Sequence, residues 1–169
     1  MAVRAIRFFG DPVLRSAADE ITRFDAHVSA LVADLLDTVA EPGRAGVAAP
    51  QIGVALRAFS YNVDGEIGYV LNPRLVEVRG EREPIDEGCL SVPGFGFARL
   101  RHPWARVVGV DLEQKPVELS GDGLMAQALQ HECDHLDGTL YIEGLEPEIK
   151  REAMRAIRQA DWFALPTST

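Results

Sequence analysis

The order in which the hydrophobic periodicity changes along the chain is the feature that most restricts its fold. Residues 26–41 carry one apolar stripe with helical spacing, which Pro42 and Gly43 end. Strand-like segments fill the middle of the chain, and two helical segments follow at 123–136 and 147–163. A doubly wound sheet would need strands and helices in regular alternation. The order therefore predicts an α+β fold, with mixed or antiparallel sheets packed around the helix at 123–136 and with an N-terminal and a C-terminal helix.

The 169 residues suit a single domain, 1–169. Asp25 and Asp122 are the expected N-caps of the first and second helices. Residues 164–169 are expected to form a loose tail. The expected strands are 55–62, 68–72, 75–78, a hairpin of 105–112 with 116–119, and a short strand at 140–142.

Composition excludes several classes of function. The formal net charge of −9 opposes non-specific binding to DNA, because phosphate neutralisation needs clustered Lys and Arg. No apolar run approaches the ~18 residues of a membrane span, and no secretory signal is visible at the N-terminus. Two cysteines do not make a disulfide framework, so a reduced, cytoplasmic setting is expected. Arg151, Arg155 and Arg158 form a possible local basic patch, although a solvated helix face explains them equally simply.

The motif His131-Glu132-Cys133-Asp134-His135 is the strongest chemical signal. Histidines four positions apart lie one helical turn from each other, so both imidazoles can reach one metal ion. Glu132 lies one step round the helix, where it can approach the water of the site as a general base. The competing interpretation is a solvated helix face with histidines at this spacing by chance.

A third ligand has two candidates. Glu152 has the spacing found in thermolysin-like enzymes, but neighbouring basic residues favour a solvated helix face. Cys89 stands in a Gly-containing segment, where a loop or strand end can present its thiolate to the metal. As a lone residue Cys89 would be interpreted as a small buried apolar side chain; beside two histidines that need a partner, a ligand is favoured. Cys133 points to the other side of the helix and is expected in the core.

Three segments together resemble peptide deformylase. The family carries, in order, a Gly-Φ-Gly-Φ-Ala-Ala-Pro-Gln segment (Φ is apolar), a Glu-Gly-Cys-Leu-Ser segment and a Gln-His-Glu-x-x-His segment. The corresponding residues here are 44–51, 87–91 and 130–135, and residues 10–14 are similar to the family's opening. One such motif would be weak evidence, whereas three in order are highly specific.

The resemblance implies an enzyme that removes the formyl group from N-formylmethionyl nascent peptides as they leave the bacterial ribosome, with transient contact to that ribosome. It implies His131, His135 and Cys89 as metal ligands and Glu132 as the acid and base. It also implies that the Gln51 amide and the Leu90 backbone N–H stabilise the oxyanion. The implied metal is Fe²⁺, with Ni²⁺ or Co²⁺ as active replacements, although the ligand types alone would suggest Zn²⁺.

The resemblance further implies that the peptide binds as an added strand. Glu87 and Arg101 are expected to form an ion pair that braces the Cys89 segment. The backbone positions that match the strand-binding site are Ala45, Gly46 and Gly88. The positions that match the methionine pocket are Ile85, Leu124, Gln127 and Ala128, and each of these four could equally be a plain core residue.

Two residues depart from the family pattern. Arg44 replaces the first glycine of the first segment, which puts the local loop shape in question. Gln127 is polar at a pocket position that is usually apolar, so the methionine pocket has a different lining.

Two other functions are compatible with the helix motif. An ordinary zinc endopeptidase would cut inside peptides and would need no role for Cys89. A non-catalytic metal-stabilised binding module would need no base at Glu132.

Overall fold

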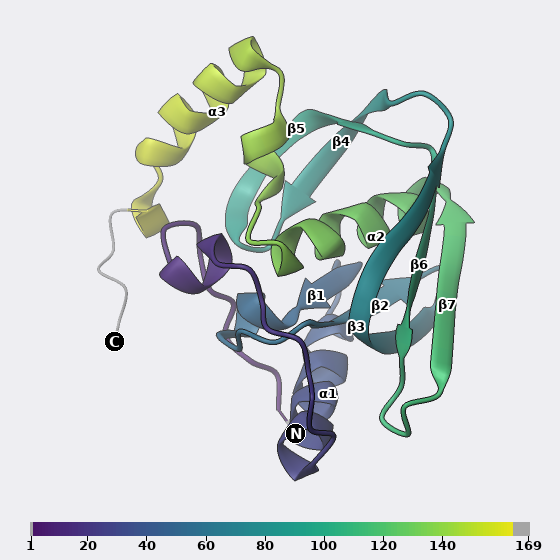
Figure 1. Ribbon diagram of the computed structural model, residues 1–169. Coiled ribbons are helices and arrows are strands. Elements are labelled where there is room, and N and C mark those ends of the chain that lie inside the picture. The colour runs from purple at the N-terminus through teal and green to yellow at the C-terminus, as the bar shows by residue number, and fades with distance from the viewer. Residues whose placement is uncertain (1, 164–169) are drawn as a thin grey trace.

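The computed structural model describes residues 2–163 and contains two antiparallel sheets and three α-helices (Figure 1). This architecture confirms the α+β prediction. None of the helices in the described part of the chain is long and apolar enough to cross a membrane. The helices are α1 (Ala26–Val39), α2 (Gly123–Leu136) and α3 (Pro147–Arg158), and the strands are β1 (Gly46–Ala48), β2 (Ala58–Val63), β3 (Glu66–Arg79), β4 (Glu83–Cys89), β5 (Val92–Arg101), β6 (Trp104–Val110) and β7 (Pro116–Asp122).

The larger sheet has the strand order β1-β2-β3-β6-β7, and β4 pairs with β5 in a separate two-stranded sheet. The short strand β1 therefore forms one edge of the larger sheet. In Figure 1, α2 crosses the middle of the molecule between β1 and β2 on one side and the β4–β5 sheet on the other, while α3 lies at one end. This arrangement leaves the two sheets facing each other across α2.

Helix α1 packs behind β1 and the adjoining strands. Its N-cap is Asp25, as predicted, since the Asp25 carboxylate accepts hydrogen bonds from the backbone N–H groups of His27 and Val28. The apolar stripe of the helix packs in one cluster with Val47 and Leu71 of the sheet. This packing fixes β1 from behind, so that its outer edge and its N-terminal residues remain available to the site described below.

Helix α2 presents different residue types on its two sides. Leu129, Cys133 and Leu136 pack against Phe59 and other residues of the larger sheet, which confirms the prediction that Cys133 belongs to the core. The histidines of the motif face away from this cluster. Asp122 does occupy the N-cap position, but its side chain makes no capping hydrogen bond, so the predicted cap interaction is absent.

Several predicted boundaries need correction. The two strands expected at 68–72 and 75–78 are one bulged strand, β3. The short strand expected at residues 140–142 is wrong, because Tyr141–Gly144 form a 3₁₀ turn; a short, fully buried apolar run has no period that separates the two. Helix α3 ends at Arg158, before a separate 3₁₀ turn at Asp161–Phe163. The tail expected at 164–169 lies outside the described residues.

Aromatic contacts join both described ends of the chain. Phe8 meets Trp162 edge to face and Phe9 stacks on Phe163. The Trp162 indole N–H donates a hydrogen bond to the carbonyl oxygen of Pro93 at 3.0 Å, and the Phe9 N–H donates to Ser91 O at 2.8 Å. Phe9 is thereby attached to the turn between β4 and β5, and Trp162 to the start of β5.

The packing behind β1 generates a stability prediction. Leu35 of α1 is fully buried, so Leu35→Ala should lower the free energy of unfolding by about 2–5 kcal/mol through lost burial and cavity formation. The neighbouring Leu36 is only partly buried, and Leu36→Ala should cost clearly less. Urea denaturation of both variants measures the difference, and equal costs would contradict the described packing of α1.

Candidate metal centre

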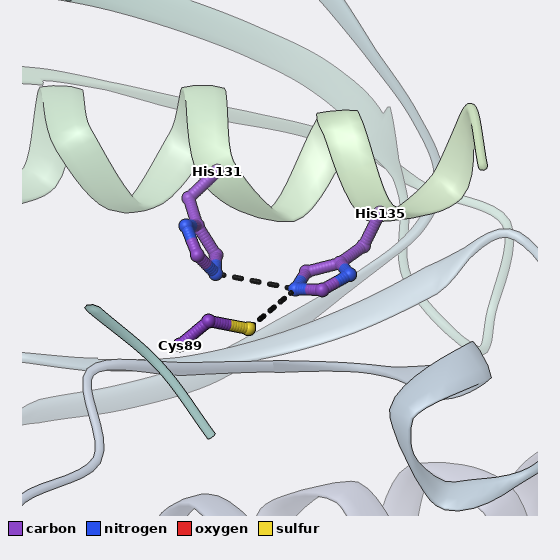
Figure 2. Close-up of side chains that lie close together, drawn as sticks. All are labelled: Cys89, His131 and His135. Atoms are coloured by element: carbon purple, nitrogen blue, oxygen red, sulfur yellow. Dashed lines mark hydrogen bonds between the residues drawn. The ribbon is translucent and has the colours of Figure 1, made fainter. Parts of the chain in front are cut away.

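Three metal-ligating side chains that are far apart in the sequence converge at one point (Figure 2). His131 and His135 project from one side of α2, and Cys89 comes from the end of β4 to meet them. The His131 and His135 Nε2 atoms are 3.2 Å apart, and His135 Nε2 lies 3.3 Å from Cys89 Sγ. All three atoms lie within 4.8 Å of one another.

These separations suit three ligands of one ion. Metal bonds of about 2.1 Å to nitrogen and about 2.3 Å to sulfur place neighbouring tetrahedral ligand atoms roughly 3.4–3.6 Å apart. The donor chemistry points the same way, since a thiolate and two imidazole lone pairs facing one another repel unless a cation lies between them. The residues therefore fit a divalent metal held by two nitrogens and one sulfur, with the remaining side open to the adjoining pocket.

A chain of paired charges fixes the orientation of His131. The His131 Nδ1–H donates to Glu87 Oε1 at 2.6 Å, which directs its Nε2 toward the metal position. Arg101 donates to both Glu87 oxygens, at 2.9 and 2.6 Å, so the predicted Glu87–Arg101 ion pair is confirmed. Arg101 also bonds Asp134 at 2.7 Å, so β4, β5 and α2 meet in one network.

Electrostatic effects on these groups follow from their partners. Burial alone would favour neutral Glu87, but hydrogen bonds from Arg101 and His131 outweigh it and lower the Glu87 pKa to about 2. Burial opposes the charge on His131, yet Cys89 and Glu87 raise its pKa well above the usual value. Burial lowers the pKa of His135. The site therefore has an ionised carboxylate, Glu87, bonded to the His131 ring, and an uncharged imidazole at His135.

Glu132 is buried beside the three ligands without being one of them. Its Oε2 atom has no hydrogen-bond partner within the described residues. Its carboxylate lies so close to Gly46 that any side chain at that position would overlap it. Burial raises the pKa of Glu132 to about 7, in the range where a carboxyl group can both accept and release a proton near neutral pH.

Gln51 is held in place by its own loop. Its Oε1 accepts a hydrogen bond from the Ala48 N–H at 2.9 Å, which directs the amide nitrogen toward Ser91 Oγ, 3.2 Å away, and Cys89 Sγ, 3.7 Å away. The Ser91 N–H donates to the same sulfur at 3.4 Å. Gln51 therefore presents its amide donor at the edge of the candidate metal centre.

A pocket of about 490 Å³ opens onto this centre. It lies between the start of β1 and the end of β4, with α2 as its floor. The structure brings to it eleven of the thirteen residues assigned to the site from sequence: Ala45, Gly46, Gln51, Gly88, Cys89, Leu90, Leu124, Gln127, Ala128, His131 and Glu132. His135 completes the ligand cluster, whereas Ile85 lines a neighbouring cavity and does not reach this pocket.

The remaining candidate ligand, Glu152, lies elsewhere. It is exposed on α3, where it surrounds a surface hollow with Arg151 and Arg155. This position matches the solvated helix face that the sequence favoured.

Sequence reasoning missed Ser91 and the part of Asp134 in the charge network. Ser91 is fully buried and contacts both Gln51 and Cys89. Both residues belong to motifs that were recognised, so their proximity in sequence to Cys89 and to the histidines was the available signal. The partner of Asp134 could not be predicted, because Arg101 lies 33 positions away and no local sequence pattern links the two residues.

Comparisons with known proteins agree with this geometry. A family model described as polypeptide deformylase matches residues 3–151. The chain is 49% identical to a peptide deformylase of Acidothermus cellulolyticus over 96% of this chain and 89% of that protein, and 47% identical to one of Parafrankia sp. over 98% and 91%. A crystal structure of a peptide deformylase from Legionella pneumophila superposes with a TM-score of 0.86 at 37% identity, covering 94% of this chain and 95% of that one.

The charge network behind His131 generates a metal-binding prediction. Glu87→Gln keeps the shape of the side chain but removes the negative charge that orients His131, so metal affinity should fall about 10–100-fold. Competition with a chromophoric chelator measures the affinity. The matched control is Glu83→Gln, at an exposed position of the same strand, which should leave it unchanged. Equal affinity in both variants would contradict the assigned role of Glu87.

Proposed function

The chain belongs to the polypeptide deformylase family, and from that premise we propose which of its residues carry out the metal-dependent removal of the N-terminal formyl group. The observation that carries the proposal is the convergence of Cys89, His131 and His135 beside a buried carboxylate, Glu132, that has no hydrogen-bond partner within the described residues. In this assignment the first three residues hold the metal and Glu132 moves the protons. Family members act on formylated nascent peptides, and this chain takes the same substrate.

A divalent metal at this site, when bound, supplies Lewis-acid chemistry by polarising the formyl carbonyl and making water acidic near neutral pH. Glu132 accepts a proton from the attacking water and later delivers it to the leaving amine. Its burial supports both halves of this task, since a carboxyl with a pKa of about 7 exchanges a proton easily at neutral pH. The products are formate and a peptide with a free amino terminus.

Two donors are proposed to stabilise the negative charge that develops on the formyl oxygen. These are the side-chain amide of Gln51 and the backbone N–H of Leu90. The support is that Gln51 is anchored by Ala48 with its amide nitrogen directed to the Cys89 side of the pocket, which Leu90 also lines. Donors fixed in this way need no reorganisation during the reaction, and each is typically worth about 10²–10³ in rate.

The peptide is proposed to bind as an extra strand between the edges of the two sheets. Gly46 at the start of β1, with Ala45 just before it, and Gly88 of β4 line opposite sides of the pocket. The methionine side chain would then point toward α2, where Leu124, Gln127 and Ala128 line the pocket. Ile85, which the resemblance also assigns to this subsite, lines the adjoining cavity.

A transient ribosome contact and a cytoplasmic location complete the proposed setting. The support for the contact is a hollow beside α3 in which three basic residues, Lys150, Arg151 and Arg158, outnumber one acidic residue, Glu143, and which also has the apolar side chains of Leu145 and Met154. Such a surface suits a partner that carries phosphate groups together with apolar protein surface.

The proposed chemistry predicts formate release from formyl-Met-Ala-Ser. Glu132→Gln should retain bound metal while formate release falls at least about 10²-fold, because the proton carrier is lost. Cys89→Ala should lose both metal and activity. Elemental analysis and a formate dehydrogenase assay measure the two quantities.

The same assay separates the competing functions. Cleavage of an amino-blocked casein peptide would favour an ordinary zinc endopeptidase. Absence of formate release from wild-type protein, with metal bound normally by Glu132→Gln, would favour a binding module. Formate release with an uncut casein peptide excludes both.

The proposed physiological metal is Fe²⁺, with Ni²⁺ and Co²⁺ as active replacements. Protein prepared without oxygen should contain iron, lose activity in air as Fe²⁺ is oxidised, and regain activity after exchange into Ni²⁺ or Co²⁺. Metal analysis paired with formate release follows this behaviour. Full activity with Zn²⁺ alone would overturn the proposal of iron.

A further inference from the structure

Two cavities of similar size lie side by side along α2. The first, of about 490 Å³, contains the candidate metal centre, and the second, of about 470 Å³, lies next to it. Within residues 2–163, Gln127 is the one residue that lines both. The side chain of Gln127 therefore stands at the boundary between them.

The boundary coincides with a hydrogen bond between two elements. Gln127 Nε2 on α2 donates to the carbonyl oxygen of Asp86 on β4 at 2.9 Å. On β4, the residues before this point, 83–85, line the second cavity, and residues 86–89 line the first. The Gln127 amide thus bridges helix and strand where one cavity gives way to the other, and Ile85 lies beyond the bridge.

The second cavity has walls that could receive an apolar chain. Pro84, Ile85 and Pro103 contribute hydrocarbon surface to it, and Glu83, His102 and Asp122 contribute polar surface. Arg101 also lines it, but the charge of Arg101 is already paired with Glu87 and Asp134. An unbranched apolar side chain could therefore extend into this space without separating an ion pair.

We propose that Gln127 is a specificity-determining residue that sets the depth of the side-chain pocket by separating it from the second cavity. This inference rests on the proposed deformylase function. With Gln127 present, the first side chain of the substrate ends at about the length of methionine. With Gln127 shortened, the two cavities join and accept unbranched apolar side chains that are several methylene groups longer.

The test compares formyl-Met-Ala-Ser with a formyl peptide that has 2-aminodecanoic acid in place of methionine. Gln127→Ala should raise the ratio of kcat/KM for the long substrate over the methionine substrate at least about tenfold, because each buried methylene contributes roughly a factor of four. Gln127→Ser is a second shortened variant and should behave alike. Gln127→Met is the matched control, since its side chain fills a similar volume, and its ratio should stay within about threefold of wild type.

Calorimetric binding of the two deformylated peptides to the metal-loaded protein gives the same ratio without turnover. Failure of wild-type protein to release formate from the methionine substrate would contradict the proposed function, whereas the binding ratio would still test the role of Gln127. An unchanged ratio in both folded shortened variants would overturn the inference. A rise in Gln127→Met as large as that in Gln127→Ala would also overturn it, because the volume of the side chain would then not be the barrier.

Discussion

The buried pairing of Glu87 with Arg101 is the interaction on which the rest of the site depends. A two-stranded sheet such as β4–β5 is only marginally stable alone and needs ties to the remainder of the molecule. Arg101 comes from β5, Glu87 from β4, and Asp134 and His131 from α2, so a single network attaches the small sheet to the central helix. Glu87 must be paired, because a buried carboxylate with no partner would strongly destabilise the fold. Its pairing with Arg101 and His131 fixes the end of β4 against α2, so Cys89, two residues beyond Glu87, lies opposite the histidines.

The same arrangement leaves room for a peptide. β1 is an edge strand and β4 belongs to a different sheet. The backbone groups that face the space between β1 and β4 are therefore not hydrogen-bonded to each other as in one continuous sheet. Helix α2 closes the floor of this space and contributes the histidines, Glu132 and Gln127. In the proposed assignment, the two histidines, Glu132 and Gln127 therefore lie on one rigid helix, with Gln127 one helical turn from His131.

Helices and chemistry could be predicted from sequence more fully than strands. The stripe of α1 and the spacing of His131 and His135 are local signals, and the structure has helices at both places. Cys89 could be chosen over Glu152 because the motif around it restricted the choice. Strands β4 and β5 carry Pro84, several charges and no regular alternation, so no local pattern indicated them; they form through pairing with each other and through the buried ion pair. The hydrogen bond between Gln127 and Asp86 joins residues 41 positions apart, so no local pattern could indicate it.

The contact between Trp162 and Pro93 has a practical consequence. Pro93 lines the pocket, so the aromatic residues at both described ends of the chain are linked directly to its rim. Ending the polypeptide before Trp162 would remove the ring contacts of Phe8 with Trp162 and of Phe9 with Phe163. It would also remove the hydrogen bond from Trp162 to Pro93 at the rim of the pocket. Trimming the polypeptide to residues 3–151, the region that the family model matches, would therefore alter the entrance of the pocket.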